Sequence, residues 1–230
     1  METGLKIKNL NKSYGELEIF RDFSVSFHQG RINCILGPSG CGKTTLLNII
    51  GGTLQADSIA QNDFMSRRFS YVFQEPRLLP WKTVKENLVF TLKDILPPKN
   101  LNEVADEYLK WVELEKFRDY FPAKLSGGMK QRLSLARAFS FPSDIILMDE
   151  PFKALDVKLK NNLINRFLEL WNKDKRTVLF VTHEVDEAIS LGHKISLLAG
   201  PPVQIIKEYE IKDKGENTRN EILELLHNFE

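Results

Sequence analysis

Hydrophobic and polar positions alternate in the first part of the chain, and continuous apolar runs replace this alternation further on. Residues 5–10 and 23–27 alternate, which predicts strands with one buried face, forming an antiparallel piece near the N-terminus. Residues 32–36, 145–148 and 178–181 are continuous apolar runs, which favour parallel strands covered on both faces. We therefore expect an α/β fold.

The middle of the chain follows a helical pattern instead. Residues 84–92, 101–112 and 128–139 are predicted helices, and the Pro97-Pro98 pair and Pro122 separate them. These helices predict a small helical lobe inserted into the α/β core.

We expect one domain over residues 1–230. Its α/β core takes residues from about 1–74 and 141–230, and its helical subdomain takes about 75–140. Two further candidate strands span residues 195–198 and 205–211. Near the C-terminus, one helical face carries an apolar stripe that we expect to pack on the same molecule: Ile222, Leu225, Leu226 and Phe229.

Composition narrows the functional class. The chain has 230 residues, 42% of them hydrophobic and 27% charged, as in ordinary globular proteins. Its formal net charge of +1 gives no general attraction to nucleic acid or to anionic membranes. We expect no membrane span and no export signal, since no apolar run approaches about 18 residues and the start is polar. The two cysteines, Cys34 and Cys41, suit a reducing cytoplasm, and Cys41 is either an alkylation-sensitive thiol or an inert small residue.

Residues 37–45 form a phosphate-binding loop motif, G-x-x-x-x-G-K-[ST], between a predicted strand and a predicted helix. In this context, backbone N–H groups and the helix dipole converge on phosphate oxygens. The motif predicts a nucleoside triphosphate and Mg²⁺ as ligands, with Lys43 on the terminal phosphates and the Thr44 hydroxyl on the metal ion. The nucleotide-binding residues predicted here are Gly37, Pro38, Ser39, Gly40, Cys41, Gly42, Lys43, Thr44 and Thr45.

Two adjacent carboxylates end the predicted strand at 145–148. Asp149 is placed to join the Mg²⁺ shell, and Glu150 to orient and deprotonate the attacking water. The alternative, a helix-capping acid pair before Pro151, leaves buried carboxylates in need of a partner.

Ser126, Gly127 and Gly128 begin the third predicted helix. They serve either as an ordinary capped start or as a second phosphate-binding terminus. One nucleotide has no evident need of two distant cradles, so we expect a head-to-tail dimer in which each subunit completes the other's site.

With these motifs in place, the sequence resembles the ATP-binding cassette (ABC) family of transporter ATPases over nearly its whole length, and residues 125–131 match the signature motif of that family. The resemblance implies an ABC ATPase of the P-loop NTPase class, with an N-terminal antiparallel β subdomain and an inserted α-helical subdomain. It further implies that Tyr14 stacks on adenine, Gln74 contacts Mg²⁺ and the attacking water, Asp156 bridges subunits, and His183 is the switch histidine at the terminal phosphate. The predicted catalytic residues are Glu150, His183, Gln74 and Lys43, and the predicted metal ligands are Thr44, Gln74 and Asp149.

Residues 73–81 and 182–188 look like the corresponding segments of importer subunits for nitrate, sulfonates, taurine and related small solutes. This resemblance implies an ATPase that powers transport, as a homodimer or a dimer with a related subunit. The implied partners of the chain are permease subunits and, for an importer, a solute-binding protein. Binding to the permease subunits would place the chain in the cytoplasm, on the inner face of the membrane. Two departures from the family stand out: residues 52–68 form a shortened stretch, and Lys153 replaces a commonly small residue.

Residues 75–82 are the candidate surface for coupling to the permease, through Leu78, Leu79 and Trp81. The alternative is that these side chains fill the core of the helical lobe. Three other functions remain as alternatives: an ABC exporter ATPase, an ABC ATPase acting on nucleic acid, and a regulatory module without turnover. The absence of a long heptad insertion or a basic stripe disfavours nucleic acid as a partner, and the joint presence of the catalytic residues disfavours the regulatory module.

Overall fold

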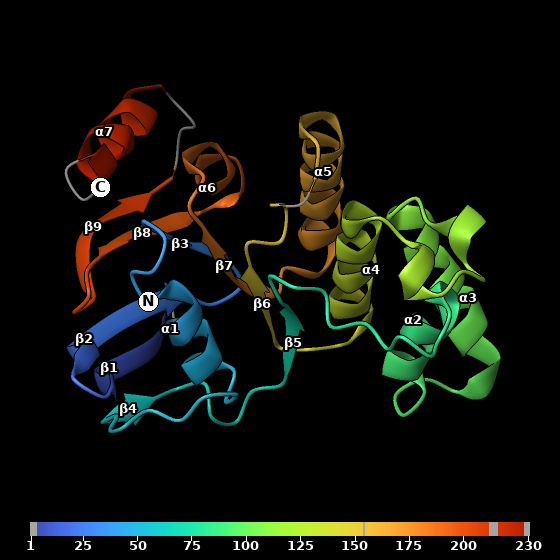
Figure 1. Cartoon of the computed structure of the whole chain (residues 1–230), viewed down its shortest axis with the longest axis horizontal. Coiled ribbons are helices and arrows are strands. Elements are labelled where there is room, and N and C mark those ends of the chain that lie inside the picture. The colour runs from blue at the N-terminus through green and yellow to red at the C-terminus, as the bar shows by residue number, and fades with distance from the viewer. Residues whose placement is uncertain (1–3, 154, 212–215, 228–230) are drawn as a thin grey trace. The chain divides into compact units, whose positions relative to one another are not determined.

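The computed structural model describes residues 4–153, 155–211 and 216–227, and these fall into two compact units (Figure 1). The first unit comprises the described residues up to Phe69 and from Lys175 onward, and the second comprises Ser70–Asp174. The second unit thus includes the strand ending at Asp149 and the long helix after it. The boundaries near residues 74 and 140 stay a prediction.

An antiparallel sheet opens the first unit. Strand β1 (Gly4–Tyr14) pairs with β2 (Leu17–His28), with Leu5 opposite Phe27 and Ile7 opposite Val25. Both strands are longer than predicted, and these four apolar side chains are buried, as period-2 alternation requires. The shortened stretch supplies only a two-residue strand, β4 (Gln61–Asn62), to the other edge of β1.

A second sheet of the first unit has the strand order β7-β3-β8-β9. Strand β3 (Ile32–Leu36) is parallel to both β7 (Thr177–Thr182) and β8 (Lys194–Ala199), and β9 (Gln204–Glu210) is antiparallel to β8. All residues of β3, β7 and β8 are buried, which explains their continuous apolar runs.

Three helices belong to the first unit: α1 (Lys43–Ile50), α6 (Val185–Leu191) and α7 (Glu216–His227). Helices α6 and α7 lie side by side (Figure 1), and Arg219 of α7 donates to Asp186 of α6 at 2.6 Å. Ile222 is fully buried, so the expectation that the C-terminal stripe packs on the same molecule is confirmed at this position. Phe229 lies outside the described residues.

The second unit combines two neighbouring strands, β5 (Phe69–Val72) and β6 (Ile145–Asp149), with four helices. The helices are α2 (Val84–Leu92), α3 (Pro98–Trp111), α4 (Gly127–Ser140) and α5 (Val157–Asp174), and two short 3₁₀ turns span Glu115–Phe117 and Pro122–Lys124. Helix α3 begins at Pro98, three residues before the predicted start, because proline suits the first turn of a helix. Helices α2, α3 and α4 share one apolar core: Val84, Leu88, Ala105, Leu109, Val112, Leu114, Leu125, Leu133 and Ala136.

Asn87 holds the loop before α2 in place. Its side chain is fully buried, and its Nδ2 donates to the carbonyls of Leu79, Lys82 and Thr83 at 3.0–3.1 Å. Its Oδ1 accepts from the Leu79 backbone N–H at 2.9 Å. One amide therefore binds four backbone groups, of which the Leu79 N–H and the Lys82 carbonyl lie outside any strand or helix.

We predict that Asn87→Ala lowers the free energy of unfolding by at least about 2 kcal/mol, because buried backbone groups lose their partner. Urea denaturation followed by circular dichroism measures this change. Asn102→Ala, at an exposed position of α3, is the control for the gain in helix propensity. An equal stability for both variants would contradict the role assigned to the Asn87 amide.

Candidate nucleotide-binding and catalytic site

The loop between β3 and α1 has no room for side chains at two of its glycines. A Cβ on Gly37 would lie 2.4 Å from the Leu198 carbonyl oxygen. Gly42 has a φ of 106°, and a Cβ there would lie 2.7 Å from Val203. The backbone therefore packs directly against the edge of the sheet, which brings the N–H groups of the first turn of α1 to the mouth of the loop.

The predicted phosphate-binding lysine lies inside this loop. Lys43 is 5% exposed, and its Nζ donates to the carbonyls of Gly37 at 2.8 Å and Pro38 at 2.6 Å. Cys41 is buried beside it, and burial raises the pKa of its thiol above the usual range. This favours the inert reading of Cys41 over the alkylation-sensitive one. Elsewhere in the loop, Ser39, Gly40 and Thr44 are exposed, and Pro38, Gly42 and Thr45 are half-buried.

Tyr14 ends β1 with half of its side chain exposed, at 51%. Lys12 Nζ lies 5.4 Å from the centre of its ring and pairs with Asp57 at 2.6 Å. Asp57 also accepts from the Ser13 backbone N–H at 2.7 Å, and its pKa is lowered by the hydrogen bond from Lys12. The shortened stretch therefore fixes the end of the strand that presents the predicted adenine-stacking ring.

His183 follows β7 and is exposed. The residue before it, Thr182, is buried: its hydroxyl donates to Glu187 Oε2 at 2.8 Å and accepts from the Glu184 backbone N–H at 3.0 Å. Glu187 is itself only 4% exposed. Sequence reasoning did not assign this pair a role, although a glutamate one helical turn after the histidine was a visible signal.

The second unit carries three of the residues predicted for the metal and water chemistry: Gln74, Asp149 and Glu150. Asp149 ends β6 and is 4% exposed. Glu150 follows with a φ of 44°, a left-handed conformation that non-glycine residues adopt only where their surroundings hold it. Gln74 Nε2 donates to Glu150 Oε2 at 3.3 Å, so the structure brings these two predicted residues together. Lys153 Nζ meets the same oxygen at 2.7 Å, a contact that sequence reasoning missed.

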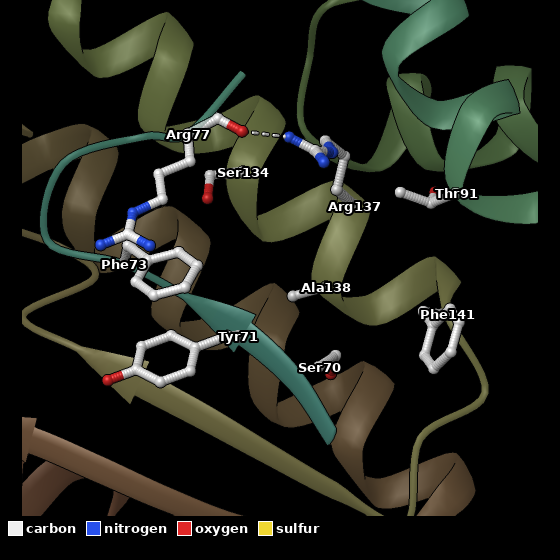
Figure 2. A pocket seen from close by; sticks show the side chains of 9 residues that line it. All are labelled: Ser70, Tyr71, Phe73, Arg77, Thr91, Ser134, Arg137, Ala138 and Phe141. Atoms are coloured by element: carbon white, nitrogen blue, oxygen red, sulfur yellow. Dashed lines mark hydrogen bonds between the residues drawn. The ribbon is translucent and has the colours of Figure 1, made fainter. Parts of the chain in front are cut away.

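A stack of side chains holds the segment that carries Gln74. The Tyr71 and Phe73 rings stack with centres 4.0 Å apart, and the Arg77 guanidinium lies 3.8 Å over Phe73 (Figure 2). Arg137 of α4 donates to the Arg77 carbonyl at 2.6 Å. Burial, reinforced by the charge of Asp149, raises the pKa of Tyr71, so its hydroxyl stays neutral.

These side chains line a cavity of about 250 Å³ in the second unit (Figure 2). Its walls are Ser70, Tyr71, Phe73, Arg77, Thr91, Ser134, Arg137, Ala138 and Phe141. None of the predicted site residues lines this cavity, so it is distinct from the predicted site. One of its lining residues, Phe73, directly precedes Gln74 in the sequence.

Ser126 is the N-cap of α4, and its Oγ accepts from the Met129 N–H at 3.3 Å. The capped-start reading therefore holds, while Ser126 and Gly127 remain exposed and Gly128 is half-buried. Asp156 is exposed and accepts from the Leu159 N–H at 3.0 Å at the start of α5. The phosphate-binding role of Ser126 and the bridging role of Asp156 stay predictions.

The donor set fits a nucleotide-borne Mg²⁺. Mg²⁺ prefers oxygen ligands and is commonly held by one or two protein carboxylates together with substrate phosphates and water. Thr44, Gln74 and Asp149 offer a hydroxyl, an amide and a carboxylate. Within the described residues, no group of three or more His, Cys, Asp or Glu side chains could hold a metal ion by itself.

Comparisons with known proteins identify the family of this chain. The family model described as ABC transporter matches residues 20–153. An uncharacterized ABC transporter ATP-binding protein of Methanocaldococcus jannaschii is 38% identical, over 97% of this chain and 89% of its own length. The aliphatic sulfonates import ATP-binding protein SsuB of Bacillus cereus is 36% identical, over 89% of this chain and 83% of its own length.

Among solved structures, a dimeric post-hydrolysis state of an ATP-binding cassette bound to ADP and Pi superposes with a TM-score of 0.81. It is 30% identical and covers 91% of this chain and 99% of that chain. The likeness confirms the predicted fold class, a P-loop ABC ATPase with an antiparallel β subdomain and a helical subdomain. In the part of the chain that the structure describes, no helix has the length and apolarity to span a membrane. Because the family model matches more than half of the sequence, this chain belongs to the ABC transporter family, as an ATP-binding subunit that hydrolyses ATP.

Proposed function

We propose that this chain powers the import of a small organic solute, such as a sulfonate, taurine or nitrate, across the cytoplasmic membrane. The observation that carries the proposal is the 36% identity, over most of both chains, with a subunit named for aliphatic sulfonate import. The importer-like segments at residues 73–81 and 182–188 support the same reading. In this role the chain works at the inner face of the membrane, held there by permease subunits, with a solute-binding protein outside.

Two copies of the chain, or one copy with a related subunit, close on two Mg·ATP molecules. Each nucleotide lies between residues 37–45 of one protomer and 126–128 of the other. The solved relative is named as a dimer bound to ADP and Pi, which supports this arrangement. The exposed backbone at Ser126 and Gly127 also supports it, because a helix start open to solvent is available to a partner's phosphate.

Within each site, Lys43 and His183 bind the terminal phosphate, Tyr14 stacks on adenine, and Thr44, Gln74 and Asp149 hold Mg²⁺. The metal supplies charge stabilisation for the phosphates when it is bound. Glu150 orients and deprotonates the attacking water, and the exposed Asp156 bridges the protomers. The contact of Glu150 Oε2 with Gln74 Nε2 at 3.3 Å supports this role, because both side chains are assigned to the same attacking water.

We expect Glu150→Gln to lower the rate of ATP hydrolysis by at least about 100-fold, because a positioned base contributes about 10²- to 10⁴-fold. ATP binding should persist, since the amide keeps the shape of the side chain. Steady-state phosphate release measures turnover, and a fluorescent ATP analogue measures affinity. Near-normal turnover would remove Glu150 as the base.

Shared sites predict complementation between two different inactive subunits. Lys43→Ala disables one loop and Ser126→Arg blocks one helix start, so each homodimer should be inactive. A mixed dimer keeps one composite site with both halves intact, and about a quarter to a half of the wild-type hydrolysis rate should return in purified heterodimers. Stable heterodimers without any recovery would contradict the shared site.

The exposure of each side chain bears on the two readings of the coupling segment, residues 75–82. Leu78 packs against the core of the helical lobe, as the alternative reading holds, whereas Trp81 is 70% exposed and fills no core. Leu79 is half-buried, and its backbone is held by Asn87. Trp81 is therefore the side chain that we assign to the permease, because tryptophan is one of the residue types enriched at the energetic hot spots of protein interfaces.

Trp81→Ala should weaken co-purification with the membrane subunits by at least about tenfold, since an anchoring tryptophan contributes about 2 kcal/mol or more. The ATPase activity of the isolated chain should stay within about twofold of wild type. Met65→Ala, at an 85% exposed apolar residue of the first unit, is the matched control. Equal recovery of the complex for both variants would argue against Trp81 as the anchor.

A further inference from the structure

Lys153 contacts the predicted catalytic base directly. Its Nζ lies 2.7 Å from Glu150 Oε2, the distance of a charge-assisted hydrogen bond. The two residues belong to one turn, closed by a backbone hydrogen bond from Lys153 N–H to the Glu150 carbonyl at 3.3 Å. Pro151 and Phe152, between them, are both buried and anchor that turn.

The two ends of this ion pair differ in their surroundings. The Lys153 side chain is 51% exposed, whereas the Glu150 side chain is 10% exposed. A surface pair between two hydrated groups contributes little, but a carboxylate that has lost most of its water depends on the donors that remain. The contact therefore matters mainly for the glutamate.

Two donors converge on one carboxylate oxygen of Glu150. Gln74 Nε2 reaches Oε2 at 3.3 Å, at the weak end of the hydrogen-bond range, and Lys153 reaches it at 2.7 Å with a full charge. Fixing one oxygen of a planar carboxylate also fixes the direction of the other. Orientation of a base toward its water matters, because a displacement of about 1 Å can cost about 100-fold in rate.

We propose that Lys153 is a positioning residue for ATP hydrolysis: it holds Glu150 by Oε2 and sets the direction in which the carboxylate meets the attacking water. The inference rests on the proposed role of Glu150 as the base. Lys153 acts through Glu150 and makes no contribution to ATP affinity.

Lys153→Met keeps the length of the side chain and removes its charge and donors. We expect it to lower kcat about three- to fivefold, the rate equivalent of an ion pair at the upper end of the range for exposed pairs. KM for ATP should stay within about twofold. Lys153→Arg restores a charged donor and should return kcat to within about twofold of wild type. Steady-state hydrolysis by the purified full chain gives both constants.

Two controls separate positioning from general damage. Lys158→Met removes an exposed lysine of the same unit and should leave kcat unchanged. In the Glu150→Gln background, Lys153→Met should cause no further loss, because two residues that act as a unit are not additive. The thermal midpoint of each variant confirms that it is folded.

An unchanged or increased kcat for Lys153→Met would overturn the inference, as would an equal loss in Lys153→Arg or an additive loss in the Glu150→Gln background. If Glu150→Gln abolishes turnover while Lys153→Met has no effect, only the positioning role fails. If Glu150→Gln retains turnover, the role of Glu150 as the base fails and the inference fails with it.

Discussion

The close approach of the phosphate-binding loop to the edge of its sheet is the constraint on which the rest of the first unit depends. Gly37 lies against the carbonyl of Leu198, and Gly42 lies against Val203 in a left-handed conformation. A side chain at either position would push the loop outward and turn the first N–H groups of α1 away from their common focus. The parallel pairing of β3 with β7 and β8 supports this approach, because it buries the strand that delivers the loop.

In the second unit, side chains hold a strained turn in place. In the first unit, glycines allow the phosphate-binding loop to approach the sheet. Glu150 adopts a left-handed conformation without being glycine, and its turn is held by buried Pro151 and Phe152 and by Lys153. A strained residue that persists in a turn of this kind requires surroundings that determine it. The left-handed conformation restricts the backbone of Glu150. Such a restriction suits a carboxylate that has to point in one direction.

Motif-bearing segments were predictable from sequence because their chemistry depends on local spacing. The loop at 37–45, the strand ending at Asp149 and the helix starting after Ser126 all occur where the residues predict them. The Lys12–Asp57 pair carried no such signal, because it depends on tertiary packing between residues distant in sequence. The Gln74–Glu150 contact was implied only through the role at the attacking water that both residues were assigned. Lys153 lies between these two cases. The sequence marked it as an unusual residue for the family, but it did not indicate that Lys153 contacts Glu150. Helix α3 began earlier than expected because Pro98 was read as a break, although proline is equally a first-turn residue.

The segment from Gln74 to Asn87 joins the candidate water chemistry to the exposed Trp81, and it is held at both ends. The Arg77 guanidinium lies over Phe73 and its carbonyl binds Arg137, while Asn87 binds the backbone of Leu79 and Lys82. A loop fixed in this way has few alternative backbone conformations. The buried Asn87 amide therefore holds the backbone on both sides of the exposed Trp81, at Leu79 and at Lys82.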